Sequence, residues 1–233
     1  MSEEQTLLFP DPRQTLDDGL LCVGGNLQVR TLFEAYRKGI FPWPQEGYPL
    51  LWFSPVKRGV LDFEDVHFTR RFLRELHKPG FTITFNRAFS QVIQMCAKTP
   101  RSHEKGTWIS DEIIQSYIRF HEAGYAHSVE CWLNDQLVGG MYGVYVEGVF
   151  SGESMFYQVS GASKRCLYAL IEHLKSYGIV WMDIQMVTPH LQATGGKYVE
   201  RDDFLARLQK AKRNFPEPFA EFREERLTSK KKV

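Results

Sequence analysis

The chain has 233 residues, which is enough for one large domain or two small ones with a real hydrophobic core. Hydrophobic residues make up 43% and charged residues 24%, the balance of an ordinary globular protein rather than of a disordered or fibrous one. With 29 basic and 28 acidic residues the net charge is +1, so the total charge neither favours nor excludes a nucleic-acid partner.

The first sixty residues are rich in Gly and Pro. The stretch "FPDPRQTLDDGLLCVGGN" (9–26) is predicted to be mostly loop. A helix is expected next, ending at Gly39, because apolar residues recur on one helical face at Val29, Leu32, Phe33 and Tyr36. The stretch 40–55 carries four prolines, which predicts no regular structure there. Its two tryptophans, Trp43 and Trp52, must then either pack in the core or bind a ligand.

The pattern becomes regular from about residue 60. Residues 66–78 are typical of a helix, and "FTITF" (81–85) alternates like a strand. Asn86 is a candidate N-cap for a helix running through Cys96. Ser110 precedes two acidic residues, which predicts a further helix that ends at Gly124.

Three alternating runs follow, at 127–133, 136–146 and 149–156, and their short connections predict an antiparallel meander. An amphipathic helix is expected over 161–178 and a last strand over 179–187. This order predicts an α+β fold with a mostly antiparallel sheet, similar in pattern to the core of GNAT-like acyltransferases. We therefore expect a small N-terminal domain (1–60) followed by a GNAT-like domain (61–233).

Polar side chains interrupt two of these strands. Asp183 and Gln185 are two apart in "MDIQM", so a regular strand points both to one face. Glu153 interrupts the apolar run "VFSGESMF", where a carboxylate is costly unless it is paired. These groups either satisfy buried backbone or form a reactive centre. Regular alternation would place Glu153 opposite Phe150, so a shared role for the two predicts a distortion of the strand near Gly152.

Other features have both a structural and a functional interpretation. Trp108 precedes a helix start, where it either packs as a hydrophobic staple or stacks on a base. Two basic clusters either form solvated faces or contact phosphates, namely Arg70, Arg71, Arg74 and Lys78 in one and Lys98, Arg101 and Lys105 in the other. An apolar set is either core or pocket wall: Leu167, Leu170 and Leu174 with Met141 and Phe150 opposite.

Several classes of site lack their signatures. The four cysteines are scattered, and the histidines show no H-E-x-x-H spacing, so no metal site or disulfide framework is expected. The sequence shows neither a signal peptide nor an apolar run of the ~20 residues that a membrane span needs. These features predict a cytoplasmic protein with reduced thiols and no membrane association.

Seven ordered motifs resemble the leucyl/phenylalanyl-tRNA–protein transferase family, and the resemblance runs from about residue 19 to about residue 205. They are "GLLCVGGNL", "AYRKGIFPW", "GTWI", "HSVECW", "LVGGMYGV", "SGESMF" and "MDIQ". The resemblance implies transfer of leucine or phenylalanine from aminoacyl-tRNA to the N-terminal α-amine of an acceptor protein, which marks the acceptor for N-degron proteolysis. It implies no metal and no cofactor.

The resemblance also implies residue roles. Asp183 and Gln185 lie at the reaction centre, where Glu153 helps to hold the reacting groups. Trp43 and Trp108 contact the terminal adenosine of the tRNA. The aminoacyl side-chain pocket uses Met141, Phe150, Leu167, Leu170 and Leu174. Left open are the choice between Leu and Phe, a basic or an acidic acceptor residue, the oligomeric state, and the role of Asp183 as a base or a positioning group.

Two other functions fit parts of the sequence. An acetyl-CoA-dependent N-acyltransferase would share the fold, but "QVSGASK" (158–164) has one glycine where the pyrophosphate-binding turn needs two. A non-catalytic RNA-binding module would leave Asp183 and Gln185 without a role.

Overall fold

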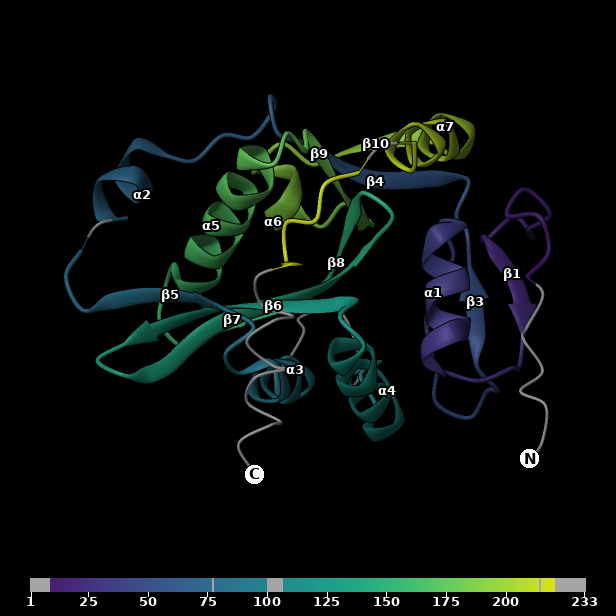
Figure 1. Cartoon of the computed structure of the whole chain (residues 1–233), viewed down its shortest axis with the longest axis horizontal. Coiled ribbons are helices and arrows are strands. Elements are labelled where there is room, and N and C mark those ends of the chain that lie inside the picture. The colour runs from purple at the N-terminus through teal and green to yellow at the C-terminus, as the bar shows by residue number, and fades with distance from the viewer. Residues whose placement is uncertain (1–8, 77, 100–106, 214, 221–233) are drawn as a thin grey trace.

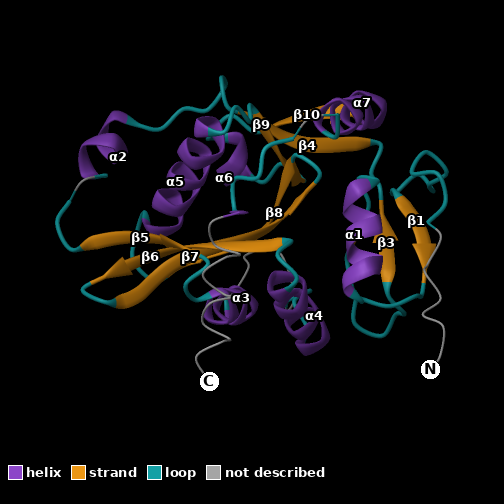
Figure 2. Ribbon diagram, in the orientation of Figure 1, coloured by secondary structure: helices purple, strands orange, loops and turns teal. Residues whose placement is uncertain are grey.

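The computed structural model describes residues 9–76, 78–99, 107–213 and 215–220. A seven-stranded sheet carries helices on both faces, and a three-stranded sheet with one helix stands at its side (Figure 1 and Figure 2). None of the helices within those ranges is both long enough and apolar enough to cross a bilayer.

The three-stranded sheet lies in the region that was predicted to be loop, so that prediction was wrong. Its strands β1 (Leu20–Val23), β3 (Leu51–Phe53) and β2 (Phe41–Pro42) pair in this order, all antiparallel. The proline is tolerated because Pro42 ends β2, an edge strand that pairs on one side only. Helix α1 (Val29–Arg37) confirms the predicted helix, and Gly39 follows it with φ 76°.

The large sheet confirms the α+β prediction. It has the order β10-β4-β9-β8-β7-β6-β5, and its one parallel pair is β8 with β9. The meander β6-β7-β8 and the crossover helix α5 (Ala162–Ser176) that leads to β9 are present as expected. The strand bounds are β4 (Lys57–Asp62), β5 (Phe81–Phe85), β6 (Ala126–Leu133), β7 (Gln136–Val146), β8 (Val149–Tyr157), β9 (Trp181–Gln185) and β10 (Lys197–Glu200). We propose that the boundary between the small N-terminal domain and the larger domain lies near residue 60.

Side chains of β7 point alternately to the two faces of the sheet and so belong to two separate hydrophobic cores. Met141 and Tyr145 pack with α5 on one face of the sheet, while Tyr142 and Val144 pack with α1, α3 (Phe89–Lys98) and α4 (Asp111–Glu122) on the other. Figure 1 shows α5 on one side of the sheet and α3 and α4 on the opposite side. The remaining helices are α2 (Arg70–Glu75), α6 (Pro189–Gln192) and α7 (Arg201–Ala211).

Helix starts were predicted with mixed success. Ser110 caps α4 as expected, since its hydroxyl accepts the Ile113 backbone N–H at 3.3 Å. Asn86 does not cap α3, which begins three residues later. Its side chain instead accepts the Ser128 backbone N–H at 3.0 Å, and the buried Glu130 carboxylate accepts the Ala88 N–H at the start of α3. Helix α2 is also shorter than the predicted 66–78.

Candidate active site

A cavity of about 490 Å³ opens where the segment after β2 meets β8, β9 and the first turns of α5. Aromatic rings, apolar side chains and a small polar group all contribute to its wall. Six of the predicted site residues line it: Trp43, Trp108, Met141, Glu153, Leu167 and Gln185. The structure therefore brings six predicted site residues to one cavity from six separate segments of the chain.

Four predicted site residues are placed differently. Phe150, Leu170 and Leu174 lie in the core on the α5 side of the sheet and do not line the cavity. Phe150 packs against the ring of Phe219, with 6.0 Å between centroids. Asp183 is also absent from the cavity wall and is 1% exposed. The predicted apolar wall is therefore revised to Met141 and Leu167, with further apolar residues that line the same cavity: Met155, Met182 and Ile184.

The predicted distortion of β8 is confirmed. Tyr142 of β7 pairs with Ser154, while the next residue, Gly143, pairs with Gly152. Glu153 is thus an extra residue on β8 without a partner in the register, which is a β-bulge. The Glu153 side chain lines the cavity, on the side of the sheet where Tyr36 and Gln185 contact it.

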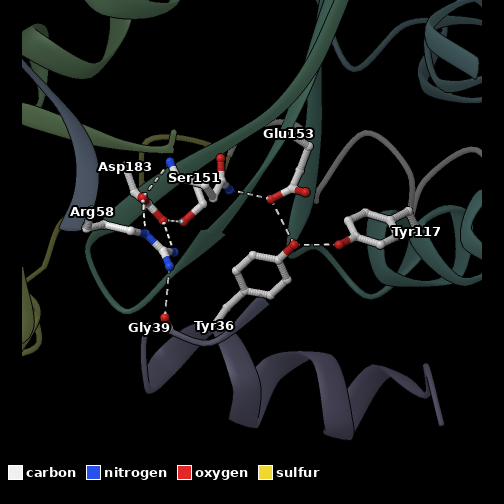
Figure 3. A network of polar contacts seen from close by, with 8 residues as sticks. Tyr36, Gly39, Arg58, Tyr117, Ser151, Glu153 and Asp183 are labelled. Atoms are coloured by element: carbon white, nitrogen blue, oxygen red, sulfur yellow. Dashed lines mark hydrogen bonds and ion pairs between the residues drawn. The ribbon is translucent and has the colours of Figure 1, made fainter. Parts of the chain in front are cut away.

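The Glu153 carboxylate accepts two hydrogen bonds, one from β9 and one from α1 (Figure 3). Its Oε1 atom accepts the Gln185 side-chain amide at 2.9 Å and the Tyr36 hydroxyl at 2.8 Å. Because the Tyr36 hydroxyl donates its hydrogen bond to Glu153, it accepts one from the Tyr117 hydroxyl, at 2.5 Å. Helices α1 and α4 therefore reach the cavity through one chain of hydroxyl groups.

Burial dominates the electrostatics of this chain. Burial raises the pKa of Glu153 to about 8, and the nearby Asp183 charge adds to the rise, although the Tyr36 hydrogen bond opposes it. Burial also raises the pKa of Tyr36 and of Tyr117 well above the usual value, so both hydroxyls stay protonated donors.

Asp183 forms a buried ion pair with Arg58. The guanidinium Nε and Nη2 donate to the two carboxylate oxygens at 2.8 and 2.7 Å, and the side chains are 2% and 1% exposed. Ser151 donates to Oδ2 at 2.9 Å, and the Gln185 backbone N–H donates to Oδ1 at 3.0 Å. Both oxygens are occupied, which suits a group that positions its neighbours.

Arg58 is itself fixed in place. Its Nη1 donates to the Gly39 carbonyl oxygen at 3.1 Å, just beyond the end of α1. Its guanidinium carbon lies 4.6 Å from the ring centroids of both Phe41 and Phe204. The ion pair is thereby enclosed between α1, α7 and the sheet.

Gln185 ends β9 in a conformation that is uncommon for a residue with a side chain. Its φ is 51°, in the left-handed region, and Asp183 accepts its backbone N–H. A Cβ atom at the facing Gly59 would lie 2.9 Å from the Met186 carbonyl carbon, so glycine is required there. Such strained backbone concentrates at functional sites. With its amide nitrogen bound to Glu153, Gln185 retains its side-chain oxygen as an acceptor for a substrate.

Sequence reasoning missed four residues of this network: Tyr36, Arg58, Tyr117 and Ser151. The signal for Arg58 lay in "KRGVL", a cation beside an apolar strand, since a buried cation requires a carboxylate and two unexplained carboxylates were already identified. No comparable signal marks Tyr117, whose position on an apolar helix face is that of any core tyrosine.

The predicted basic clusters are partly described. Arg70, Arg71, Arg74 and Lys78 are exposed on or just after α2, and Lys98 is exposed at the end of α3. Arg101 and Lys105 lie outside the described residues. Within the described part of the chain, no three His, Cys, Asp or Glu side chains gather in a way that could hold a metal ion.

Replacing Glu153 with glutamine should change how stability depends on pH. Unfolded, the carboxyl has its ordinary pKa of 4.5, whereas folded it has a pKa of about 8. Between these values the folded state binds more protons, so the free energy of unfolding falls as pH rises through the window. Urea titrations at intervals from pH 5 to pH 8.5 should show a smaller fall for Glu153→Gln. Parallel curves for the two proteins would contradict the raised pKa.

Comparison with known sequences gives matches over most of the chain. Residues 25–56 match the family described as "Leucyl/phenylalanyl-tRNA protein transferase N-terminal domain", and residues 60–209 match "Leucyl/phenylalanyl-tRNA protein transferase". A leucyl/phenylalanyl-tRNA–protein transferase of Flavobacterium psychrophilum is 45% identical over 88% of this chain and 98% of its own length. The enzyme of the same name from Pectobacterium carotovorum is 46% identical over 88% and 87%.

A comparison with solved structures finds more distant similarity. A GCN5-related N-acetyltransferase from Kribbella flavida matches 71% of this chain and 58% of its own chain, at 10% sequence identity and a TM-score of 0.37.

Proposed function

Because the chain belongs to the leucyl/phenylalanyl-tRNA protein transferase family, we propose that it transfers leucine or phenylalanine from aminoacyl-tRNA to the N-terminal α-amine of an acceptor protein. The observation that carries the proposal is a single cavity that holds two tryptophans, an apolar wall and the Gln185–Glu153 pair. The product carries a new N-terminal residue that marks it for N-degron proteolysis, and the proposed place of the reaction is the cytoplasm. The acetyl-CoA alternative is not favoured, because the related sequences are tRNA–protein transferases.

The donor end of the reaction uses the aromatic and apolar parts of the wall. Trp43 and Trp108 are the stacking surfaces for the terminal adenine of the tRNA. Met141 and Leu167 contact the leucyl or phenylalanyl side chain. The exposed cations of α2 bind phosphates of the acceptor stem with little sequence preference.

The acceptor end uses the polar group. The Gln185 side-chain oxygen accepts a hydrogen bond from the α-amine and directs the nitrogen lone pair at the ester carbonyl carbon. Glu153 fixes the amide of Gln185, and Asp183 fixes its backbone, so the role of both carboxylates is to position Gln185. The ester is already activated, so positioning supplies much of the rate and no covalent enzyme intermediate is needed.

The transfer balances without a cofactor. The amine nitrogen forms a bond to the ester carbonyl carbon, and the bond from that carbon to the ribose oxygen breaks. The proton that leaves the amine ends on the ribose hydroxyl that is released. One peptide bond replaces one ester, and no electron acceptor is involved.

A transfer assay tests the proposal. Purified protein is mixed with tRNA charged with labelled Leu or Phe and with peptides that begin with Arg, Lys, Asp or Glu. We expect label in at least one peptide, and the panel identifies the acceptor residue. Absence of transfer to all four peptides from both donors would overturn the proposed function.

Shortening Met141 should change the choice between the two donors. Met141→Ala widens the apolar wall, so kcat/KM for Phe relative to Leu should rise roughly tenfold, the range that a methylene-sized difference in a pocket produces. Leu170→Ala is the matched control, because Leu170 is equally buried but does not line the cavity. It should lower stability without changing the ratio. Equal ratios in all three proteins would remove Met141 from the pocket.

A further inference from the structure

Helix α2 has one buried face and one strongly basic face. Phe72 is buried, and the Thr69 hydroxyl caps the helix start by accepting the Phe72 N–H at 3.2 Å. The outer face carries Arg70, Arg71 and Arg74. A helix of six residues is too short to be stable on its own, so its position depends on what it packs against.

Arg165 of α5 holds the far end of this helix. Its two terminal guanidinium nitrogens donate to the backbone carbonyl oxygens of Glu75, the last residue of α2, and Leu76, the C-cap that follows it. The guanidinium carbon also lies 4.2 Å from the ring centroid of Phe81. Arg165 is only 5% exposed, so its charge is enclosed here and is not available to a large ligand.

Aromatic rings hold the other side of the same helix. Tyr168 of α5 packs edge-on against Phe68 and Phe72, with centroid distances of 5.4 and 6.4 Å. Arg165 and Tyr168 belong to the same turns of α5 that present Ser163 and Leu167 to the cavity. One stretch of α5 therefore fixes both the cavity wall and the basic helix.

From this arrangement we infer that Arg165 is a positioning residue for nucleic-acid binding: it sets the basic face of α2 at a fixed place relative to the cavity, so that acceptor-stem phosphates and the aminoacylated end of the tRNA are bound together. The inference rests on the proposed function. Arg165 is buried and does not contact the tRNA, so its effect on tRNA binding is indirect.

Two donor substrates separate this role from an effect on the cavity. Aminoacyl-tRNA spans the cavity and α2, whereas leucyl-adenosine, the ester of the terminal nucleoside alone, fills only the cavity. In Arg165→Lys the charge remains, but an ammonium cannot reach both carbonyls with the fixed fork of a guanidinium. We expect KM for leucyl-tRNA to rise roughly tenfold with kcat unchanged, and the slope of log KM against log salt to fall by about 2 as phosphate contacts are lost. Transfer from leucyl-adenosine should stay within twofold of the wild type.

Matched variants make the test decisive. Lys175→Met removes an exposed cation from the same helix and should change neither substrate. Tyr168→Leu removes a half-buried ring that packs against Phe68 and Phe72, so it should also weaken the attachment of α2. It should raise KM for leucyl-tRNA and leave transfer from leucyl-adenosine unchanged. This variant tests the inference even if Arg165→Lys is too unstable to purify. In a background with Arg70, Arg71 and Arg74 changed to Gln, Arg165→Lys should add no further loss.

Three results would overturn the inference: a wild-type KM for leucyl-tRNA in Arg165→Lys, equal losses with both donors, or a full additional loss in the background that lacks the α2 arginines. Failure of the proposed function is distinguishable, because it would appear as absence of transfer from leucyl-tRNA by the wild-type protein itself.

Discussion

Replacing Gln185 with asparagine should reduce kcat/KM for aminoacyl transfer by roughly 10²-fold, the loss expected when a reacting group is misplaced by about 1 Å. Asparagine tolerates the left-handed backbone that residue 185 adopts, so the fold is retained. Its side chain is one methylene too short to hold both Glu153 and the acceptor amine. The affinity for aminoacyl-tRNA, measured by filter binding, should stay within twofold.

The same variant distinguishes a role of Gln185 in the reaction from a purely structural role at the end of β9. Retained transfer and retained tRNA binding would make Gln185 a structural residue. Gln185→Ala is a weaker choice, because alanine removes the amide altogether and, unlike asparagine, is not favoured at φ 51°. Glu153→Gln is a useful companion, since its amide can still accept from Tyr36 and should retain more activity than Gln185→Asn.

Replacing Arg58 with methionine should lower the free energy of unfolding by about 3–5 kcal/mol, because it leaves the Asp183 carboxylate buried without its partner. Urea denaturation measures the change. In the double variant Arg58→Met with Asp183→Asn no charge remains buried, so part of the loss should be recovered. A double variant less stable than Arg58→Met alone would show that the ion pair is not the source of the effect.

A surface pair provides the control for that experiment. Lys175 and Glu172 form an ion pair at 3.0 Å with both side chains about half exposed. Solvent screens such a pair, so Glu172→Gln should cost less than about 1 kcal/mol. The contrast tests burial, since both pairs join opposite charges at similar distances.

Residue periodicity was enough to predict the longer helices and strands, because each carries its own pattern of apolar residues. The three strands of the meander and α5 were found because each carries a clear periodicity, and the bulge at Glu153 followed from requiring one strand to serve two faces. The three-stranded sheet was missed because its strands are two to four residues long and contain no pattern of their own. These strands form because the side chains of Trp52 and Phe41 are buried in the hydrophobic core.

The sequence indicated individual residues of the candidate site but not the long-range contacts between them. Cavity residues such as Glu153 and Gln185 stood out as polar groups in apolar strands. The placement of Asp183 could not be predicted, because it depends on Arg58, which lies 125 positions earlier in the chain. Leu170 and Leu174 share the helical periodicity of Leu167, and Phe150 is an apolar strand residue like its neighbours. Only the three-dimensional packing separates core from cavity wall.

Helix α1 and the residue after its end make two contacts with the site, one to Glu153 and one to Arg58. These contacts limit the insertions and deletions that α1 can accept. Tyr36 reaches Glu153 from the last turns of the helix, and the Gly39 carbonyl receives Arg58 one turn later. Each residue of an α-helix turns the chain by about 100°. Inserting or deleting a single residue between 29 and 35 would shift the helix phase and force a choice between burying the face at Leu32 and keeping Tyr36 at the centre. The spacing within α1, and not only its composition, therefore fixes the geometry of the proposed reaction centre.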